Sequence, residues 1–309
     1  MVLALSVAKA QQTTTSVTDG STPSGLQPGS PAGSYGLSDF DNVNLYNGNL
    51  NFHLPLLQIS GRGSAQMAST LALNVKSWHV SHLHKEMPDG NTIDSYKPTQ
   101  LGWSPYSGLG AGSMTGRNYG LLTSSNLTCT WYSKTLSRIT FSMPGGTEYE
   151  LRDQQTNGQP LSSSCTQGAN RGKVFVTADG TAATFISDTD IIDHTSINLV
   201  GPHSFTVSGY LMLRDGTRYR IDGGSVTWIR DRNGNMLRFA YTSNSMTITD
   251  SLNRTVTVNY NVSDVAPYGL CDRIVYSGFA GGQRIIRVSH TSLENVLRSG
   301  YTIKTLGNT

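Results

Sequence analysis

Apolar and polar residues alternate along much of this chain, which is the pattern of β-strands with one buried face. The alternation is clearest from Tyr219 to Tyr260, where two short strands each end in a tyrosine. The first follows Asp231-Arg-Asn-Gly234-Asn and the second follows Asp250-Ser-Leu-Asn253-Arg. The aspartates recur 19 residues apart (231 to 250), as do the tyrosines (241 to 260). A fixed period with matched chemistry predicts a repeat architecture.

The residues between these strands predict tight hairpin turns, because Asp, Asn and Gly tolerate positive φ or bond to the nearby backbone. Three earlier units have a similar form, with a strand on each side of a Gly-Thr pair that begins at Gly146, Gly180 or Gly216. We therefore expect a degenerate array of hairpins that starts near Ile139.

The N-terminal half is also rich in strand signals. Two alternating runs lie between Val43 and Gly63, with Asn47-Gly48 as a hairpin turn, and Pro55 indicates an edge strand or a bulge. Residues 69–80 favour one long strand. Residues 81–120 have little pattern and are expected to form an insertion loop. Near the other end, Ser292 to Arg298 is the one stretch that favours a helical turn.

These patterns divide the chain into four parts. Residues 1–10 are expected to be a partial signal peptide, since an apolar run precedes Ala8-Lys9-Ala10, so the protein is expected to be secreted or associated with the cell envelope. Residues 11–36 form a flexible Gly/Pro/Ser/Thr-rich linker. Residues 37–130 form an N-terminal β-rich cap, and residues 131–309 a hairpin-repeat region that stays open at its C-terminal end.

Composition supports the all-β prediction and excludes some partners. The 309 residues include 33 glycines, and only 14% are charged, well below the roughly 25% of an average domain. Lys and Arg do not gather into one block of the sequence, so no nucleic-acid partner is expected. No apolar run approaches the roughly 18 residues of a membrane-spanning helix, so no membrane span is expected. Cys129 and Cys165 are the better disulfide pair, which leaves Cys271 as a thiol.

The Asp-x-x-Gly and Asp-x-x-Asn turns, with Tyr241 and Tyr260, resemble the YD repeats of the rearrangement-hot-spot (Rhs) family. The segment Val43-Asn-Leu-Tyr-Asn-Gly-Asn-Leu50, with Leu54-Pro55-Leu56 and Gly61-Arg62-Gly63, is similar to the region that precedes the repeats in large Rhs proteins. Together these features cover roughly residues 35–300.

The resemblance implies a curved, open sheet of stacked antiparallel hairpins. In the Rhs family such sheets coil into a shell that encloses or delivers a C-terminal domain, often a toxin, and some members bind carbohydrate. This sequence has too few repeats to close a shell, and it lacks the Asp-Pro-containing segment at which the family cleaves itself. The pattern also breaks off at the end, which predicts a truncated chain whose partners are further repeats or a cargo domain. Cleavage and toxicity are therefore not expected here.

Three clusters carry metal-binding side chains. His82 and His84 share one face of a strand, with His79 on the other, and with Glu86 or Asp89 they suggest zinc. Asp188, Asp190 and Asp193 suggest calcium. Asp231, Asn233 and Asn235 match the first half of a calcium loop, but its glycine stands at the fourth position instead of the sixth, and Thr242 stands where such a loop has Glu. A polar strand end explains the first cluster and a hairpin turn explains the third, so no metal or cofactor is expected.

Catalytic patterns are weak. The sequence has no Gly-x-Ser-x-Gly elbow, and Gly108-Leu-Gly110-Ala-Gly112 lacks the third glycine of a dinucleotide fingerprint. Trp103, Tyr106, Tyr119 or Trp131 could stack against sugar rings if exposed, although buried rings would only pin their loops. The leading hypothesis is thus a non-enzymatic structural segment with no catalytic residues. A carbohydrate-binding surface module and a glycoside hydrolase with carboxylates on separate strands are the alternatives.

Overall fold

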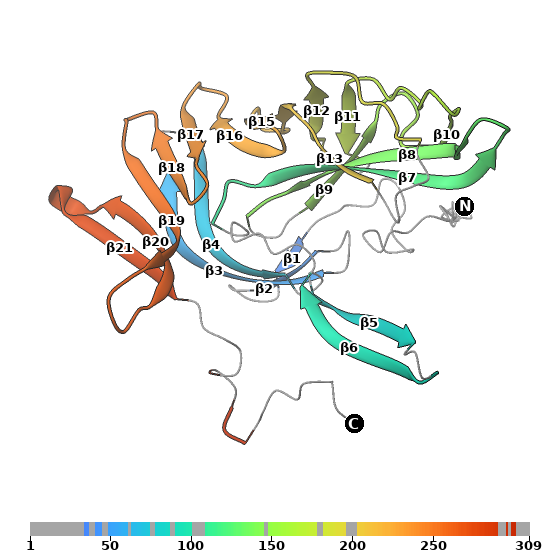
Figure 1. Ribbon diagram of the computed structural model, residues 1–309. Helices are drawn as coiled ribbons and strands as arrows, with labels where there is room; N and C mark the ends of the chain where they lie inside the picture. Colours follow the sequence, from blue (N-terminus) through green and yellow to red (C-terminus); the bar gives the residue numbers. More distant parts are fainter. Residues whose placement is uncertain are drawn as a thin grey trace, which may run out of the picture.

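The computed structural model describes residues 34–36, 41–44, 49–60, 63–74, 78–86, 90–100, 109–144, 148–177, 182–195, 203–289, 295 and 298–300 (Figure 1). The expected signal peptide and most of the expected linker lie outside these residues, as does nearly all of the expected helical turn at 292–298. The last three linker residues form a short strand. The regular structure of the described chain consists of strands and short 3₁₀ segments, so the all-β prediction is confirmed.

The strands fall into three sheets. The first contains β1 (Ser34–Gly36), β2 (Asp41–Asn44), β3 (Asn49–Ser60) and β4 (Gln66–Asn74). The second is the hairpin of β5 (Trp78–Glu86) and β6 (Thr92–Gln100). The third and largest begins at β7 (Ser113–Ser125) and ends at β21 (Gln283–Ser289).

Eight strands of the largest sheet form a closed antiparallel barrel. In order around the barrel they are β7, β8 (Thr130–Ser142), β9 (Glu148–Asp153), β11 (Val174–Thr177), β12 (Thr184–Ser187), β14 (Gly209–Met212), β15 (Arg218–Asp222) and β16 (Ser225–Arg230). The two-residue strand β10 (Leu161–Ser162) pairs with β8 outside this circuit. The expectation of an open curved sheet is therefore wrong for this part of the chain.

The barrel closes along the outer edge of β7. Ser113 of β7 pairs with Ser225 of β16, and the amide of Met114 donates to the carbonyl of Gly224 at 2.7 Å. Further along the same edge, β13 (His203–Thr206) pairs with β7 and continues almost directly into β14. The edge of β7 is thus paired along part of its length instead of being exposed, which removes the edge that an open sheet would leave.

Two side chains fit this seam closely. A Cβ atom at Gly116 would collide with the ring of Phe205, its partner across β7 and β13, so glycine permits the close pairing. On the other side of the seam, the Tyr241 hydroxyl donates to the carbonyl of Val226 at 2.7 Å. The repeat tyrosine Tyr241 therefore braces the strand at which the barrel closes.

The barrel interior is filled by side chains. Phe141 of β8 and Tyr219 of β15 come from strands on opposite sides of the circuit, and their ring centroids are 5.3 Å apart. Apolar residues along these two strands and others of the barrel are also buried, namely Ile139, Leu151, Phe175, Phe185, Leu211, Ile221 and Ile229. The period-two pattern seen in the sequence is thus the inward face of the barrel.

Five further strands extend the sheet from β16: β17 (Met236–Tyr241), β18 (Ser245–Asp250), β19 (Thr255–Ser263), β20 (Leu270–Ser277) and β21. This set, called the hairpin arm, leads away from the barrel (Figure 1). Its buried residues join the barrel core in one cluster, which also includes Ile59 of β3 and Met67 of β4. The first sheet therefore covers the buried face of the arm.

One turn type recurs along the barrel and the arm. Leu213–Thr217, Asp231–Asn235, Asp250–Arg254 and Gly278–Gly282 each bond the first amide to the fifth carbonyl and the fourth amide to the first carbonyl. The fourth residue has positive φ in every case: Gly216 87°, Gly234 88°, Asn253 58° and Gly281 77°. In the first three turns this is the pattern of a type I turn with a left-handed bulge, whereas in the last one Ala280 also has positive φ (59°), so that turn shares only the hydrogen bonds. The four turns join β14–β15, β16–β17, β18–β19 and β20–β21. The last of these turns is the short 3₁₀ segment η2 (Phe279–Gly281). The same hydrogen-bonded turn thus recurs beyond the 19-residue tandem.

Other local predictions have mixed outcomes. The strands on either side of the three Gly-Thr units pair antiparallel as expected, as β8–β9, β11–β12 and β14–β15, although the first two Gly-Thr pairs lie outside the described residues. The pairing of β3 with β4 shifts register between Pro55 and Leu57, which confirms the predicted bulge, since proline has no amide to donate. Strands β2 and β3 form the predicted hairpin, although Asn47-Gly48 lies outside the described residues.

Two predictions for the N-terminal half are wrong. The single strand expected at 69–80 is instead the end of β4 and the start of β5. The expected insertion loop at 81–120 contains most of β5, all of β6 and the first part of β7. Polar residues on these long hairpins hid the alternation. The expected cap boundary at residue 130 also falls within the β7–β8 hairpin of the barrel.

Replacing Phe141 by alanine should destabilise the barrel by about 3–5 kcal/mol, because the change leaves a cavity beside Tyr219 that the closed wall cannot collapse to fill. Leu127→Ala is the control, since that side chain is fully exposed. Urea unfolding followed by circular dichroism measures both. Equal unfolding free energies for the two variants would contradict a packed interior.

Candidate functional site

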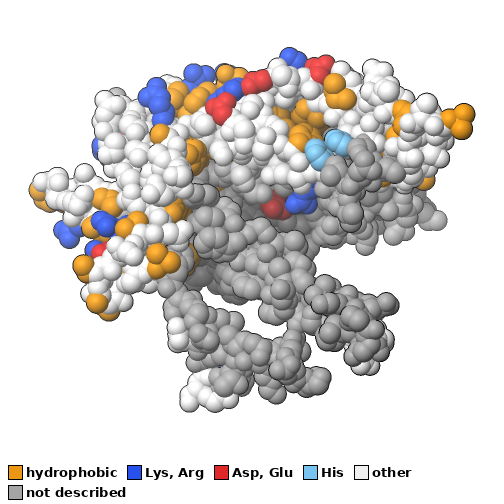
Figure 2. Space-filling view, in the orientation of Figure 1, with side chains coloured by type: hydrophobic (Ala, Val, Ile, Leu, Met, Phe, Trp, Pro, Cys, Tyr) orange, Lys and Arg blue, Asp and Glu red, His pale blue; other side chains and the backbone are white. Residues whose placement is uncertain are grey.

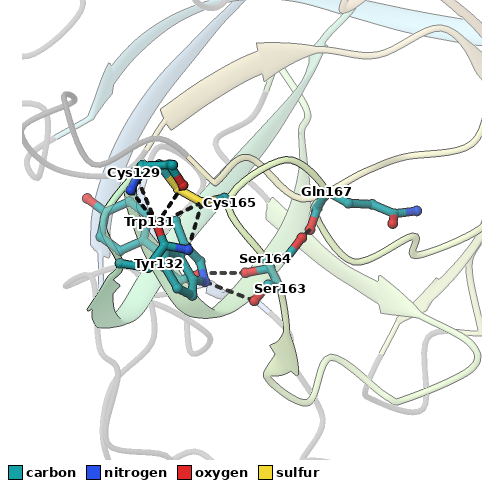
Figure 3. Close-up of a disulfide and its surroundings, with 9 residues drawn as sticks. Cys129, Trp131, Tyr132, Ser163, Ser164, Cys165 and Gln167 are labelled. Carbon is teal, nitrogen blue, oxygen red and sulfur yellow. Dashed lines mark hydrogen bonds between the residues drawn. A yellow bond between two sulfur atoms is a disulfide. The ribbon is translucent and has the colours of Figure 1, made fainter.

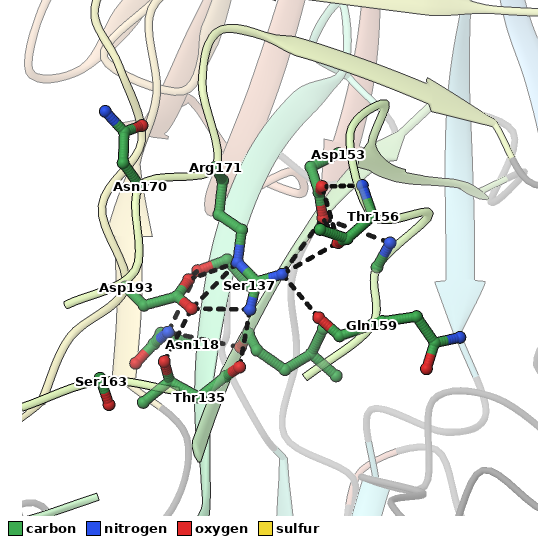
Figure 4. A network of polar contacts seen from close by, with 12 residues as sticks. Asn118, Thr135, Ser137, Asp153, Thr156, Gln159, Ser163, Asn170, Arg171 and Asp193 are labelled. Carbon is green, nitrogen blue, oxygen red and sulfur yellow. Dashed lines mark hydrogen bonds and ion pairs between the residues drawn. The ribbon is translucent and has the colours of Figure 1, made fainter. Parts of the chain in front are cut away.

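The most extensive polar cluster of the described chain surrounds Arg171, whose side chain is fully buried (Figure 4). Its Nε and Nη2 atoms donate to Asp193 Oδ2 at 2.9 and 2.7 Å, and its Nη1 atom lies 3.3 Å from Asp153 Oδ2. Nη1 also donates to the Gln159 carbonyl at 2.7 Å, and Nη2 to the Thr135 carbonyl at 2.6 Å. The guanidinium therefore links β8, the end of β9, the segment that follows β9 and the segment around Asp193.

The two carboxylates of this cluster are occupied by protein donors. Asp193 accepts the hydroxyls of Thr135 at 2.7 Å and Ser137 at 2.6 Å, in addition to Arg171. Asp153 accepts the Thr156 amide at 2.7 Å and the Gly158 amide at 3.2 Å. A buried ion pair with this many hydrogen bonds is typical of a structural clamp, because every lone pair that could reach a ligand already has a donor.

The three carboxylates of the candidate calcium cluster do not converge. Asp193 is held by Arg171, whereas Asp188 forms a two-pronged contact with Arg220 at 2.8 and 2.8 Å, and Asp190 accepts the Asn170 amide at 2.8 Å. The hydrogen bond from Arg220 keeps the pKa of Asp188 below its ordinary value, so this carboxylate stays ionised. Among the residues that the structure describes, no three His, Cys, Asp or Glu side chains are grouped as metal ligands.

Asp188, Asp190 and Asp193 line the wall of a cavity of about 920 Å³ between β13 and the segment 187–195. His194 and His203 stack in this cavity with ring centroids 4.3 Å apart. Burial lowers the pKa of His194, and the neighbouring His203 lowers it further, so the neutral imidazole is favoured at neutral pH. Figure 2 shows histidine side chains beside hydrophobic ones on this face of the molecule. The cavity can accept a small ligand, but its acidic groups are already held, Asp188 by Arg220, Asp190 by Asn170 and Asp193 by Arg171.

The disulfide prediction is confirmed. Cys129 and Cys165 are bonded, with Cα atoms 6.1 Å apart, and they join the turn after β7 to the segment after β10 (Figure 3). Trp131 lies beside this bridge, where its indole N–H donates to the Ser163 carbonyl at 3.0 Å. This ring is half-buried and pins the crosslinked segment, so it does not provide the open stacking surface considered for sugars. Cys271 is a buried free thiol, and burial raises its pKa.

Several sequence candidates cannot be placed as a site. Trp103, Tyr106 and Asp89 lie outside the described residues. His79, His82, His84 and Glu86 lie on β5, for which the structure describes the backbone alone, so the zinc hypothesis stays untested. Tyr119 is buried on β7. Gly110 and Gly112 lead into that strand, and no helix follows them, so a dinucleotide loop is absent there.

The repeat aspartates cap their own turns. Asp231 Oδ1 accepts the amides of Asn233 at 2.9 Å and Asn235 at 2.8 Å, and its Oδ2 accepts the Asn235 side chain and the Ser64 amide. Asp250 Oδ1 likewise accepts the amides of Leu252 and Arg254 at 2.8 and 2.9 Å. The hairpin-turn explanation of Asp231, Asn233 and Asn235 therefore holds, and the Ser64 contact also docks the β3–β4 turn onto the arm.

Sequence reasoning missed two groups of residues. Arg171 and Asp153 belong to polar stretches without a motif, and only their contacts in the folded chain show that they form a buried cluster. An outward row of arginines on β15, β16 and β17 was also missed, although Arg218, Arg220, Arg230 and Arg238 stand at alternating strand positions. The alternation along each strand places these arginines on the outer face, and that signal in the sequence could have predicted that they lie on one surface.

The chain matches no protein-family model, no curated protein and no solved structure. Within the part of the chain that is described, no helix is long and apolar enough to cross a membrane.

Substituting Arg171 by methionine should destabilise the protein by about 3–5 kcal/mol, because Asp153 and Asp193 would remain buried without their cation. Arg284→Met is the matched control, since that arginine is exposed on β21 and exposed charges contribute about 0–1 kcal/mol. Chemical denaturation distinguishes the two variants, and similar losses of stability would refute the clamp.

Lowering the pH should weaken the repeat turns. The Asn235 side-chain amide lowers the pKa of Asp231, and for Asp250 the bonds from Arg254 and Leu252 outweigh the effect of burial, so this pKa is lowered too. Both folded pKa values lie below the unfolded value of about 3.9, so the unfolded chain binds more protons as the pH falls. Their stabilisation should be complete above about pH 5 and decline below about pH 4.

The test is urea unfolding of the wild type and Asp250→Asn between pH 7 and pH 3. The stability difference between them should be largest at neutral pH and shrink below pH 4. A difference that stays constant down to pH 3 would show that Asp250 does not act through its ionised form.

Proposed function

We propose that this chain is a non-enzymatic structural segment of an exported or cell-envelope-associated protein of the Rhs/YD-repeat type. In this proposal it forms part of a β-shell that encloses or delivers a cargo domain carried by a longer chain. The observation that carries the proposal is the repeated turn, which adds one hairpin after another to the sheet from β14 to β21.

The side chains that define the repeat support an architectural role. The carboxylates of Asp231 and Asp250 accept hydrogen bonds from turn amides, and the Tyr241 hydroxyl donates one to a carbonyl at the barrel seam. The closed barrel gives the arm a fixed starting edge at β16, and the first sheet covers the buried face of the arm. Such a unit can anchor a growing wall of hairpins, in which each new pair of strands buries its apolar face against neighbouring elements.

Growth would continue at β21. Among the described strands, β21 pairs only with β20. Counting from the Gly278–Gly282 pair, antiparallel alternation points the amides of Gln283, Ile285 and Arg287 away from β20. Outward amides and carbonyls on an edge strand form a template for a further strand.

The residues predicted for a carbohydrate-binding module or a glycoside hydrolase give these two alternatives less support. Trp131, one of the aromatics considered for sugars, bonds internally. The acidic side chains at the cavity beside β13, which a hydrolase would need free, are held by Arg171, Arg220 and Asn170. A hydrolase needs two carboxylates that face a shared substrate.

The 309-residue chain should self-associate through β21 as its concentration rises, because the edge can pair with that of another copy. Ile285→Pro removes an outward amide and leaves the β20–β21 bonds in place, so it should weaken association about tenfold, the equivalent of about 1.4 kcal/mol. Sedimentation velocity over a range of concentrations measures this.

Ile285→Val is the control and should associate like the wild type. A wild-type chain that stays monomeric at all concentrations, or an Ile285→Pro chain that associates as strongly as the wild type, would overturn the assignment of β21 as the growing edge.

A further inference from the structure

The outer face of β14–β17 carries alternating aromatic and cationic side chains. Tyr210, Arg220, Trp228 and Arg238 stand directly opposite one another on four consecutive strands. Arg218 and Arg230 form a second opposed pair, two residues along the same strands. These six residues are called the Arg–Trp platform. Figure 2 shows Lys or Arg side chains together with hydrophobic ones along the upper part of this view, where β15–β17 lie.

The platform has cations without carboxylate partners. Arg218 faces Arg230 across the strands, and like charges directly opposite each other are destabilising. Within the described chain, no carboxylate forms an ion pair with Arg218, Arg230 or Arg238. An uncompensated group of guanidiniums around one indole ring is an arrangement that an external anion would relieve.

The aromatic rings pre-arrange the guanidiniums. The Arg230 guanidinium lies over the Trp228 ring at 5.5 Å, and that of Arg220 lies over the Tyr210 ring at 4.8 Å. A guanidinium stacked on a ring keeps its N–H donors directed from its edge, where they can grip a carboxylate or sulfate with two bonds. Ordering these side chains before binding reduces the entropy lost on binding.

The platform also has acceptors for hydroxyl groups. Asp188 and Asp222 hold Arg220 between them, and their side chains remain 38% and 45% exposed. Thr227 donates to Asp222 at 2.6 Å and fixes its orientation. A partner that fits must therefore present anionic groups to three arginines and tolerate, or donate to, two carboxylates beside them.

We propose that the Arg–Trp platform binds an acidic polysaccharide in which a carboxylate or sulfate recurs on alternate sugars. Neighbouring strands lie about 4.8 Å apart and residues two positions along a strand about 6.8 Å apart, so Arg218 and Arg238, which differ by two strands and two positions, are separated by about 12 Å. That spacing suits widely spaced anions separated by uncharged, hydroxyl-bearing rings. The apolar faces of those rings pack against Trp228 and Tyr210, and their hydroxyls donate to Asp222 and Asp188.

Nucleic acid fits the platform less well. Each strand of a duplex carries a phosphate about every 3.4 Å, which is a much denser charge than three free arginines match. The carboxylates of Asp188 and Asp222 would also repel such a backbone. An acidic peptide would lack the ring hydroxyls. The proposal is independent of the architectural role above, because no platform residue contributes to the repeat turns or to the β21 edge.

Isothermal titration calorimetry of the full-length chain tests the proposal with defined probes. A hyaluronan decasaccharide presents carboxylates on alternate sugars, and a chondroitin sulfate decasaccharide adds sulfates. Comparing their affinities shows whether carboxylates alone are bound or sulfates are also required. Uncharged dextran, a deoxythymidine oligonucleotide and poly-glutamate are the comparison probes. At least one acidic glycan should bind more tightly than all three.

Arg230→Ala and Trp228→Ala should each raise the Kd for that glycan about tenfold. Arg284→Ala, an exposed arginine on β21, is the matched control and should leave the Kd unchanged. Melting curves confirm that the variants are folded, and Arg230→Lys provides a milder change at the same site. Tighter binding of the oligonucleotide or of poly-glutamate, no binding of either acidic glycan, or an equal loss in Arg284→Ala would overturn the proposal.

Discussion

The structure depends on the pairing that closes the barrel at the edge of β7. The bond from Met114 to Gly224 and the pairing of β13 with β7 turn a continuous meander into a closed wall. Closure sets the curvature of β16, and β16 is the strand on which the hairpin arm begins. If this edge opened, Phe141 and Tyr219 would lose the enclosure in which their rings meet, and Tyr241 would lose the strand carbonyl to which it bonds.

Two kinds of polar residue sustain this arrangement for different reasons. The repeat aspartates lie at turns, where a short carboxylate reaches several amides of its own loop. Arg171 lies inside the structure, where it must satisfy each of its donors or destabilise the fold. The turns can recur along the sequence because they are local, whereas the Arg171 cluster requires residues from several distant segments and occurs at one place in the described chain.

The same distinction explains what the sequence could predict. Local chemistry identified the strands around Asp231 and Asp250, the bulge at Pro55 and the Cys129–Cys165 bridge. Closure could not be foreseen, because β7 and β16 are more than 100 residues apart and their contact leaves no period in the sequence. Long polar hairpins such as β5–β6 were mistaken for a loop because neither face gives a clear alternation. The Arg171 cluster and the Arg–Trp platform arise only when strands are placed side by side.

Hydrogen exchange at the seam tests the central claim most directly. The amides of Met114 and Gly224 donate across or beside the closing contact, to the carbonyls of Gly224 and Val207 respectively. In a closed barrel, native-state exchange measured by NMR should show both amides exchanging only through global unfolding, as slowly as core amides such as that of Leu211. Exchange at the rate of the outward amide of Ile285 on the edge strand β21 would show that the sheet is open and would contradict the account.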